Sequence, residues 1–201
     1  MLIRTITAAA LLIAAAPAAA QPLPPHVFPP RVAAPATHDG AHDFDFLLGD
    51  WKAHVKRLPD RLVGSSAWVE YDGTDSHHSV LGSAANFEEF EVDSPNAPPG
   101  AIKHIHAQTL RLYNPTSRQW SIYGFDLAAG TMDLPAVVGA FHDGLGEFYN
   151  QQDWKGRMVL VRYQWGHKGP DDAHMEQAFS LDGGKTWEVN WICDLVRAKP
   201  R

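Results

Sequence analysis

Two histidines on one expected strand are the first residues whose types and spacing could do chemistry. His104 and His106 are two positions apart, so on a strand they share a face with Leu110 and Leu112. This parity predicts that the pair faces the interior. A metal or haem site would need a nearby carboxylate and further ligands, yet no Glu or Asp follows before Asp126. We therefore predict that the pair lines a pocket or lies on the surface, and we expect no bound metal or cofactor. A metal or haem role is the alternative.

Carboxylates that could act as a catalytic pair form no sharp pattern. Glu88, Glu89 and Glu91 form a charge run that is typical of a solvated strand face. The other candidate aspartates adjoin predicted turns, where Asp is expected because it bonds the turn backbone. The sequence has neither a G-x-S-x-G elbow nor a phosphate loop, and we expect its single cysteine, Cys193, to be an inert core thiol. Whether the chain is an enzyme is therefore left undetermined.

Residues 180–187, SLDGGKTW, match the S-x-D-x-G-x-T-W pattern of Asp-box hairpins in glycoside-processing β-propellers. A propeller needs several such units, and the sequence shows no internal repeat, so we interpret the segment as a hairpin turn. A three-residue loop at 183–185 makes one face of this hairpin almost wholly apolar. The predicted pairs are Phe179 with Val189, Gln177 with Trp191 and Met175 with Cys193 on that face, and Ala178 with Asn190 on the solvent face.

The same register predicts an apolar wall of three strands, because pairing Trp165 with Met175 adds the preceding strand to this face. Such a wall covers a core or lines a cavity. Burying an amide without partners costs about 1–3 kcal/mol, so Gln177 must bond Tyr163, water or a ligand. A filled core with one satisfied glutamine is the alternative. The predicted ligand-binding residues are Tyr163, Trp165, Gln177, Phe179, Trp191, His104, His106 and Asn150.

The elements that must position these residues are short strands with alternating apolar and polar side chains, separated by turn motifs such as Asp72-Gly73 and Asp143-Gly144. One short helical turn is expected around 44–48. The pattern predicts an all-β fold, an antiparallel meander closed as a barrel of about 8–10 strands, with a sandwich as the alternative. The expected strands are 51–57, 64–71, 76–81, 86–92, 102–113, 119–126, 137–142, 146–153, 157–166, 173–181 and 186–197.

The ends of the chain predict export. Arg4, a short apolar run and the small residues Ala18–Ala20 fit a signal peptide over 1–20, cut after about Ala20, which places the protein in the periplasm or outside the cell. A Pro/Ala-rich disordered leader is expected over 21–41, one barrel domain over 42–197 and a tail over 198–201. After removal of the signal peptide, which contains Arg4, the chain has sixteen Lys and Arg and twenty-three Asp and Glu. Its net charge is therefore negative, which makes nucleic acid a poor partner. No apolar run is long enough to predict membrane insertion.

The segment FDFLLGDWKAHVKR resembles an uncharacterised family of exported bacterial domains with an F-x-F-L-x-G-x-W opening, for which the resemblance implies no activity. The matching residues are Phe44, Phe46, Leu47, Gly49 and Trp51, with further matches over Leu110–Tyr123 and Glu176–Trp191. Gly49-x-Trp51 together with Arg197 also resembles the start and end of lipocalins and other calycin barrels. That likeness implies that Trp51 and Arg197 close the barrel, with the guanidinium lying across the indole.

Three functional hypotheses follow from these observations. The leading one is an exported barrel that binds a small, largely apolar molecule inside. The second is an enzyme acting on a small organic substrate in the same cavity, which would require ionisable groups that converge there with shifted pKa values. The third is an envelope interaction module without a pocket, tethered by the leader. The sequence predicts neither the ligand nor the oligomeric state.

Overall fold

The computed structural model describes residues 34–82, 84–127 and 129–199, which form eleven strands and one short 3-10 helix. None of the helices in these residues is long and apolar enough to cross a membrane. The elements are η1 (Asp45–Leu47), β1 (Gly49–Arg57), β2 (Val69–Val80), β3 (Ala85–Asp93), β4 (His104–Asn114), β5 (Gln119–Asp126), β6 (Thr131–Met132), β7 (Val137–His142), β8 (Leu145–Trp154), β9 (Arg157–Gly166), β10 (Asp172–Ser180) and β11 (Glu188–Arg197).

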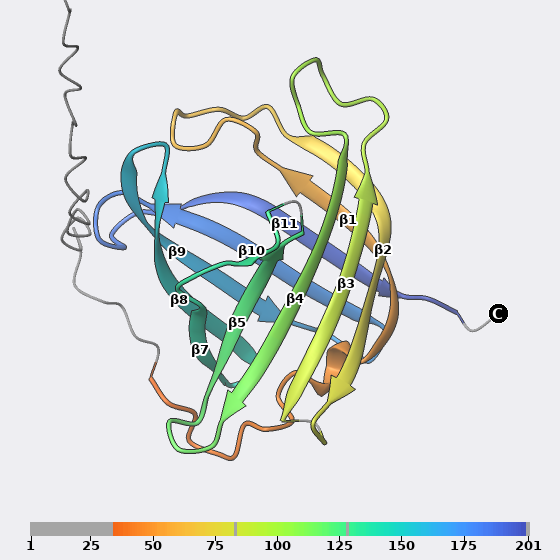
Figure 1. Cartoon of the computed structure of the whole chain (residues 1–201), viewed down its shortest axis with the longest axis vertical. Coiled ribbons are helices and arrows are strands. Elements are labelled where there is room, and N and C mark those ends of the chain that lie inside the picture. The colour runs from red at the N-terminus through yellow and green to blue at the C-terminus, as the bar shows by residue number, and fades with distance from the viewer. Residues whose placement is uncertain (1–33, 83, 128, 200–201) are drawn as a thin grey trace, which may run out of the picture.

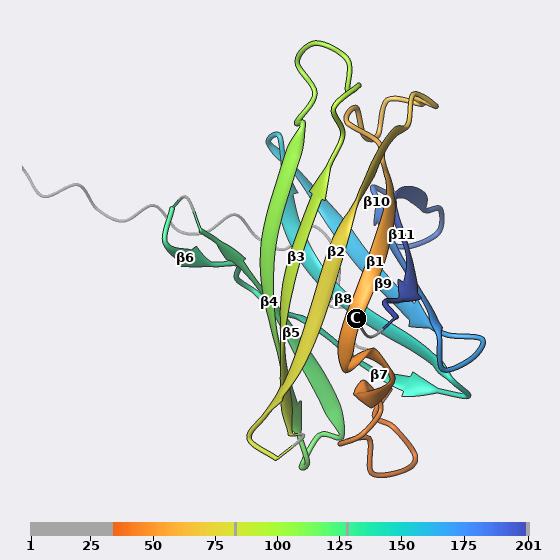
Figure 2. The same cartoon turned by 90° about the vertical axis from the view of Figure 1, so that its right-hand side faces the viewer.

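Ten of these strands close into an antiparallel barrel (Figure 1). Each strand pairs with the next along the chain, except that β5 pairs with β7, and β11 returns to pair with β1. The two-residue β6 pairs only with the end of β5 and stands off the barrel wall (Figure 2). The all-β fold class, the closed barrel and the short helical turn are therefore confirmed.

The alternation of side chains explains why the wall closes around one core. On β1 the buried side chains are Trp51, Ala53 and Val55, whereas Lys52 and His54 between them point outward. At one end of the barrel, Phe44, just before η1, and Leu47, in η1, are fully buried in the core, and the ring of Phe44 packs with those of Trp120, Phe141 and Phe148. This end of the interior is a filled core.

The first and last strands meet through an arginine and a tryptophan. Trp51 is opposite Arg197 in the β1–β11 register, and the guanidinium carbon lies 4.0 Å from the centre of the indole ring. The same guanidinium donates hydrogen bonds to the carbonyl oxygens of Pro170, Leu48 and Phe46, at 2.8, 2.9 and 3.0 Å. Arg197 therefore joins three segments at the seam of the barrel.

The predicted turn at Asp72-Gly73 is wrong, because both residues lie inside β2, which joins the end of the strand expected at 64–71 to the strand expected at 76–81. A Cβ on Gly73 would lie 2.0 Å from the carbonyl oxygen of Glu91 and 2.7 Å from Cα of Val92. Glycine is needed here because the backbone of β3 passes directly over it, and not because the chain reverses.

The C-terminal hairpin also departs from the predicted register at one end. Gln177 pairs with Trp191 and Met175 with Cys193, as expected, but a β-bulge after Gln177 places Ala178 opposite Val189 and Phe179 opposite Glu188. The bulge changes which residues of β11 face each side, because it places Val189 with Ala178 and Glu188 with Phe179, while Phe179 still packs with Val161 inside the barrel. Ala178, Ser180 and Asn190, which were expected to face solvent, are all buried.

Part of the segment expected to be a disordered leader contacts the barrel. Ala36 is buried and donates its backbone N–H to the carbonyl oxygen of Arg118, and Gly40 bonds the side chains of Tyr113 and Trp120. The expected signal peptide, the rest of the leader and the last two residues of the tail lie outside the described residues.

Candidate ligand-binding cavity

A cavity of about 230 Å³ lies inside the barrel, next to the filled core. Its walls come from β2 to β5 on one side and from β9 to β11 on the other. The lining includes the partly exposed residues Gly124 and Phe125. These two residues lie beyond the pair Ile122–Val137, where the pairing of β5 with β7 ends. At this level the edge of β5 instead bonds Asp133 and pairs with β6. The apolar lining consists of Phe125 together with Phe90, Ala107, Ile122, Tyr163, Trp165, Met175, Trp191 and Cys193.

Arg111 is the centre of a buried polar network at one side of this cavity. Its guanidinium donates to the Glu88 carboxylate at 2.6 Å, to Oδ1 of Asn86 at 3.2 Å and to Nδ1 of His77 at 3.3 Å. The charge is also sandwiched between aromatic rings, 5.2 Å from the centre of Phe44 and 5.0 Å from that of Trp165. A charge that is 1 % exposed can persist here because it is paired, bonded and stacked.

The tautomer of His77 follows from these contacts. Arginine has no acceptor atom, so Nδ1 of His77 must accept, and Nε2 then carries the proton and donates it to Oδ2 of Asp75 at 2.9 Å. His77 is fully enclosed and links Arg111 to Asp75 without lining the cavity itself. Asp75, Glu88 and Arg111 do line it.

The two carboxylates in this network are pushed toward opposite protonation states. Burial, reinforced by the charge of Glu88, raises the pKa of Asp75 and outweighs its bond to His77. Burial would also raise the pKa of Glu88, but Arg111, His77 and a hydrogen bond with Thr109 together lower it. We therefore assign the negative charge to Glu88, which is paired with Arg111. Of the two carboxyl groups, Asp75 is the one that keeps its proton more readily.

Three buried polar atoms on cavity-lining residues have no hydrogen-bond partner within the described part of the chain. They are Oδ1 of Asp75, Nε of Arg111 and Nε1 of Trp165. Each unpaired group costs about 1–3 kcal/mol relative to a bonded one. A bound molecule with a polar end, or water, would recover part of this cost.

The donor atoms of Asp75, His77 and Glu88 lie within 4.8 Å of one another, a spacing that could hold a metal ion. The guanidinium of Arg111, however, is within hydrogen-bonding distance of both His77 and Glu88. A cation placed among these atoms would be repelled by Arg111 and would have to displace it. The three residues are better explained as partners of the arginine than as metal ligands.

Four of the eight predicted site residues line the cavity together, namely Tyr163, Trp165, Gln177 and Trp191. The amide of Gln177 donates to Oδ1 of Asn190 at 2.7 Å, so its main partner is a buried neighbour that was expected to face solvent. Burial, with a contribution from the charge of Asp133, raises the pKa of Tyr163 to about 12, so its hydroxyl is a neutral donor.

Two of the predicted residues are inside the barrel but outside this cavity. Phe179 packs with Val159 and Val161 in a second small core, beneath the guanidinium of Arg61 at 5.1 Å. Asn150 lines an adjoining void of about 60 Å³ and donates its amide to the carbonyl oxygen of Pro135 at 2.9 Å.

His104 and His106 lie on the outer face of β4, so the prediction that they face the interior is wrong. The inward parity of β4 carries Ala107, Thr109 and Arg111, which line the cavity. The partly buried Leu110 and Leu112 suggested the opposite assignment. An arginine can occupy an interior position here because Glu88, on the neighbouring strand β3 and two residues from the position opposite Arg111, pairs with its charge.

Sequence reasoning missed Asp75, Glu88 and Arg111 as interior residues. For Glu88 a usable indication was present, because it shares strand parity with Phe90 and Val92, both buried, whereas Glu89 and Glu91 have the other parity. Treating the three glutamates as one solvated run hid the inward one.

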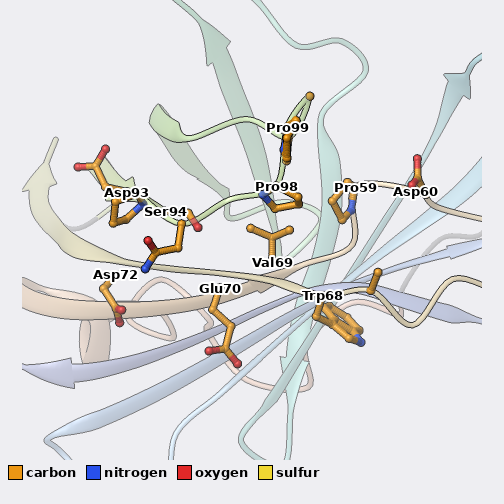
Figure 3. Close-up of a pocket in the computed structure, with 15 residues that line it drawn as sticks. Pro59, Asp60, Trp68, Val69, Glu70, Asp72, Asp93, Ser94, Pro98 and Pro99 are labelled. Atoms are coloured by element: carbon orange, nitrogen blue, oxygen red, sulfur yellow. The ribbon is translucent and has the colours of Figure 1, made fainter.

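A larger hollow of about 710 Å³ lies outside the barrel, between the segment before β2 and the loop after β3 (Figure 3). Its lining residues do not converge. Figure 3 shows Val69 pointing toward Pro98, whereas the carboxylates of Glu70 and Asp72 project from the other side of the strand. Those two acids instead meet Lys56 and His54 on the outer face. The smaller interior cavity is therefore the better candidate site.

No protein-family model and no curated protein matches this sequence. Among solved structures, the fold is similar to the crystal structure of Rv2717c from M. tuberculosis, with a TM-score of 0.52. That match covers 81% of this chain and 99% of the other, at 10% sequence identity. The likeness supports the barrel fold and carries no activity.

Proposed function

We propose that this chain is an exported protein whose barrel binds a small molecule with a largely apolar body and one polar end. The observation that carries the proposal is the interior cavity, in which aromatic walls converge on a buried, partly unsatisfied polar network. Mostly apolar cavities with a few placed polar groups are typical of small-molecule sites.

The cavity volume limits the size of the ligand. An apolar cavity of about 150 Å³ is enough to bind benzene. A cavity of about 230 Å³ therefore suits one ring with a short substituent. Trp165 and Trp191 offer flat surfaces to such a ring, while Arg111 and Asp75 provide the polar side. For a molecule of this size we expect dissociation constants in roughly the micromolar to millimolar range.

A cavity-filling variant tests the proposal. Ala107 on β4 lines the cavity, so Ala107→Phe should fill it and weaken the binding of small aromatic probes at least about tenfold. Toluene, benzyl alcohol, benzamide and benzoate, observed by saturation-transfer NMR, would also show which polar end is preferred. Thr74→Phe, which adds a ring to the exposed face of β2, is the matched control and should retain binding.

Two results would reject the proposal. One is a wild-type protein that binds none of these probes saturably. The other is an Ala107→Phe protein that is folded by circular dichroism and binds the probes as well as wild type.

One observation favours a second function, an enzyme acting on a small organic molecule in the same cavity. Asp75 and Glu88 both line the cavity and their pKa values are shifted in opposite directions, which is the arrangement found where one carboxyl group donates a proton and another stays charged. In this reading Asp75 is the proton donor. Asp75→Asn should then abolish conversion of any substrate found by screening while the protein stays folded, whereas equal conversion by the variant would exclude this role.

A further inference from the structure

We propose that the outer face of β3 and β4 carries a site for a divalent transition-metal ion, held by His104, His106 and Glu91, with Asp93 orienting His104. The two strands lie side by side on the near wall of the barrel (Figure 1). This site is separate from the interior cavity and does not depend on the proposed function.

The strand register brings the four side chains together on one face. Glu91 is directly opposite His106, and Asp93 is directly opposite His104. All four side chains point away from the core, since the alternate positions, such as Phe90 and Val92, are buried. The side chains of His104, Glu91 and Asp93 are 51 %, 59 % and 65 % exposed, so a metal ion can reach them from solvent.

His104 is already oriented as a metal ligand. Its Nδ1 lies 2.9 Å from Oδ1 of Asp93, and because a carboxylate only accepts, the ring proton is on Nδ1. The lone pair on Nε2 is then free. Metal-binding histidines commonly have this arrangement, in which a carboxylate bonds the other ring nitrogen and fixes the tautomer.

The distance to Glu91 fits a bridging ion. Nε2 of His104 lies 3.7 Å from Oε1 of Glu91, which is longer than a hydrogen bond. Two ligands that each bind a tetrahedral zinc ion at about 2.1 Å are roughly 3.4 Å apart. A small side-chain adjustment would let both atoms bind one ion.

His106 supplies the third ligand. Its ring centre lies 6.4 Å from that of His104, whereas two imidazoles on one tetrahedral zinc ion have ring centres roughly 5 Å apart. Both rings are exposed and can close this gap by rotation about their side-chain bonds. Water would complete the coordination. Two imidazoles and one carboxylate suit Zn²⁺, Ni²⁺ or Cu²⁺ better than Mg²⁺ or Ca²⁺, which prefer all-oxygen sites.

His174 on β10 provides the matched control. It also lies between two carboxylates, but both of its ring nitrogens are engaged, with Asp194 at 2.7 Å and Glu176 at 3.2 Å. No second histidine lies two positions away on its strand. His174 is thus a histidine in a similar exposed, acidic setting that lacks the second imidazole and the free lone pair.

The test is calorimetric titration of tag-free protein, dialysed against EDTA, with Zn²⁺ and Ni²⁺. We expect one saturable site. His104→Ala and His106→Ala should each weaken binding at least about tenfold, Asp93→Asn should weaken it about 10–100-fold, and His174→Ala should leave it unchanged. With Cu²⁺, electron paramagnetic resonance should show two coordinated imidazole nitrogens in wild type and one in either single variant.

All of these substitutions are on exposed positions, so circular dichroism melting curves should show folded variants. The proposal is overturned if wild type binds neither ion saturably. It is also overturned if the double variant His104→Ala/His106→Ala binds as well as wild type, or if His174→Ala weakens binding as much as His104→Ala does.

Discussion

Replacing Arg111 with methionine should destabilise the barrel far more than loss of an ordinary ion pair does. In the native protein this side chain satisfies Glu88, Asn86 and His77, and it fills the space between two aromatic rings. Methionine has similar length and keeps much of the packing. It cannot neutralise the carboxylate of Glu88, which is only 8 % exposed.

The expected cost follows from that stranded charge. Removing one partner of a buried ion pair typically costs about 3–5 kcal/mol, against about 0–1 kcal/mol for an exposed pair. A domain with about 5–15 kcal/mol of total stability would lose a large part of it. The double variant Arg111→Met/Glu88→Gln removes both charges, so it should cost about 2 kcal/mol less than the sum of the two single changes.

Equilibrium urea unfolding of the four proteins, at several pH values, measures these quantities. In wild type the pKa of Glu88 is lowered, so its contribution is present above its unfolded pKa of about 4.3 and is lost as pH falls through the folded value. In Arg111→Met, burial instead raises the pKa of Glu88. As pH falls, the variant therefore gains stability relative to wild type. The difference between their free energies of unfolding should become smaller.

The reasoning would be refuted by a cost below about 1 kcal/mol for Arg111→Met at neutral pH. It would equally be refuted if the costs of the two single changes added up to the cost of the double variant. A difference in unfolding free energy between wild type and Arg111→Met that does not vary with pH would also refute it. Each result would show that no buried charge had been left unpaired.

Arg197→Met should cost about 2–4 kcal/mol in urea unfolding, because it removes a cation–π contact with Trp51 worth about 0.5–2 kcal/mol and leaves carbonyl oxygens unbonded. Gly73→Ala should cost about 3 kcal/mol or more, since its Cβ would collide with backbone, whereas Gly166→Ala, with no atom closer than 3.9 Å to the added Cβ, should cost far less. Partial burial would lower the pKa of His174, but the carboxylates of Asp194 and Glu176 outweigh it and raise that pKa. The stabilisation of the protein by His174 is therefore complete below its unfolded pKa of about 6.5 and is lost as pH rises through the folded pKa. His174→Gln should therefore destabilise the protein at pH 6 and have little effect at pH 9.

Each of these three expectations can fail in a specific way. If Arg197→Met left the free energy of unfolding almost unchanged, the seam between β1 and β11 would be held without the stacked guanidinium. Equal costs for the two glycine variants would show that β3 does not pass close to Gly73. A His174→Gln effect that grows with pH would reverse the assigned sign.

The fold was predictable because strand alternation and turn composition are local properties. The hairpin pairs of Gln177 with Trp191 and of Met175 with Cys193 followed from matching apolar faces. The Asp72-Gly73 turn was wrong because the reason for that glycine is the backbone of a different strand, which no local pattern contains. The bulge after Gln177 was missed for a similar reason, since burial of Asn190 depends on its bond to Gln177.

The candidate site was predictable only on its apolar side. Tyr163, Trp165 and Trp191 were placed correctly because large apolar side chains indicate an interior face. Arg111 was not, because a charge is normally taken as a sign of solvent, and its partners come from β2 and β3 rather than from its own strand. The carboxylates beside His104 were not predicted for the same reason, since they lie on the neighbouring strand β3 and far from His104 in the sequence.

The most direct test of the proposed cavity is methionine methyl NMR during titration with small aromatic alcohols, amides and carboxylates. Met175 lines the cavity, whereas Met132 is on the exposed β6 and Met158 is at the start of β9, away from it. The resonance lost in Met175→Leu should shift saturably with at least one probe in wild type, and should stay fixed in Ala107→Phe, while those of Met132 and Met158 hardly move. A Met175 resonance that no probe shifts, or that shifts equally in the filled variant, would contradict a ligand site inside this barrel.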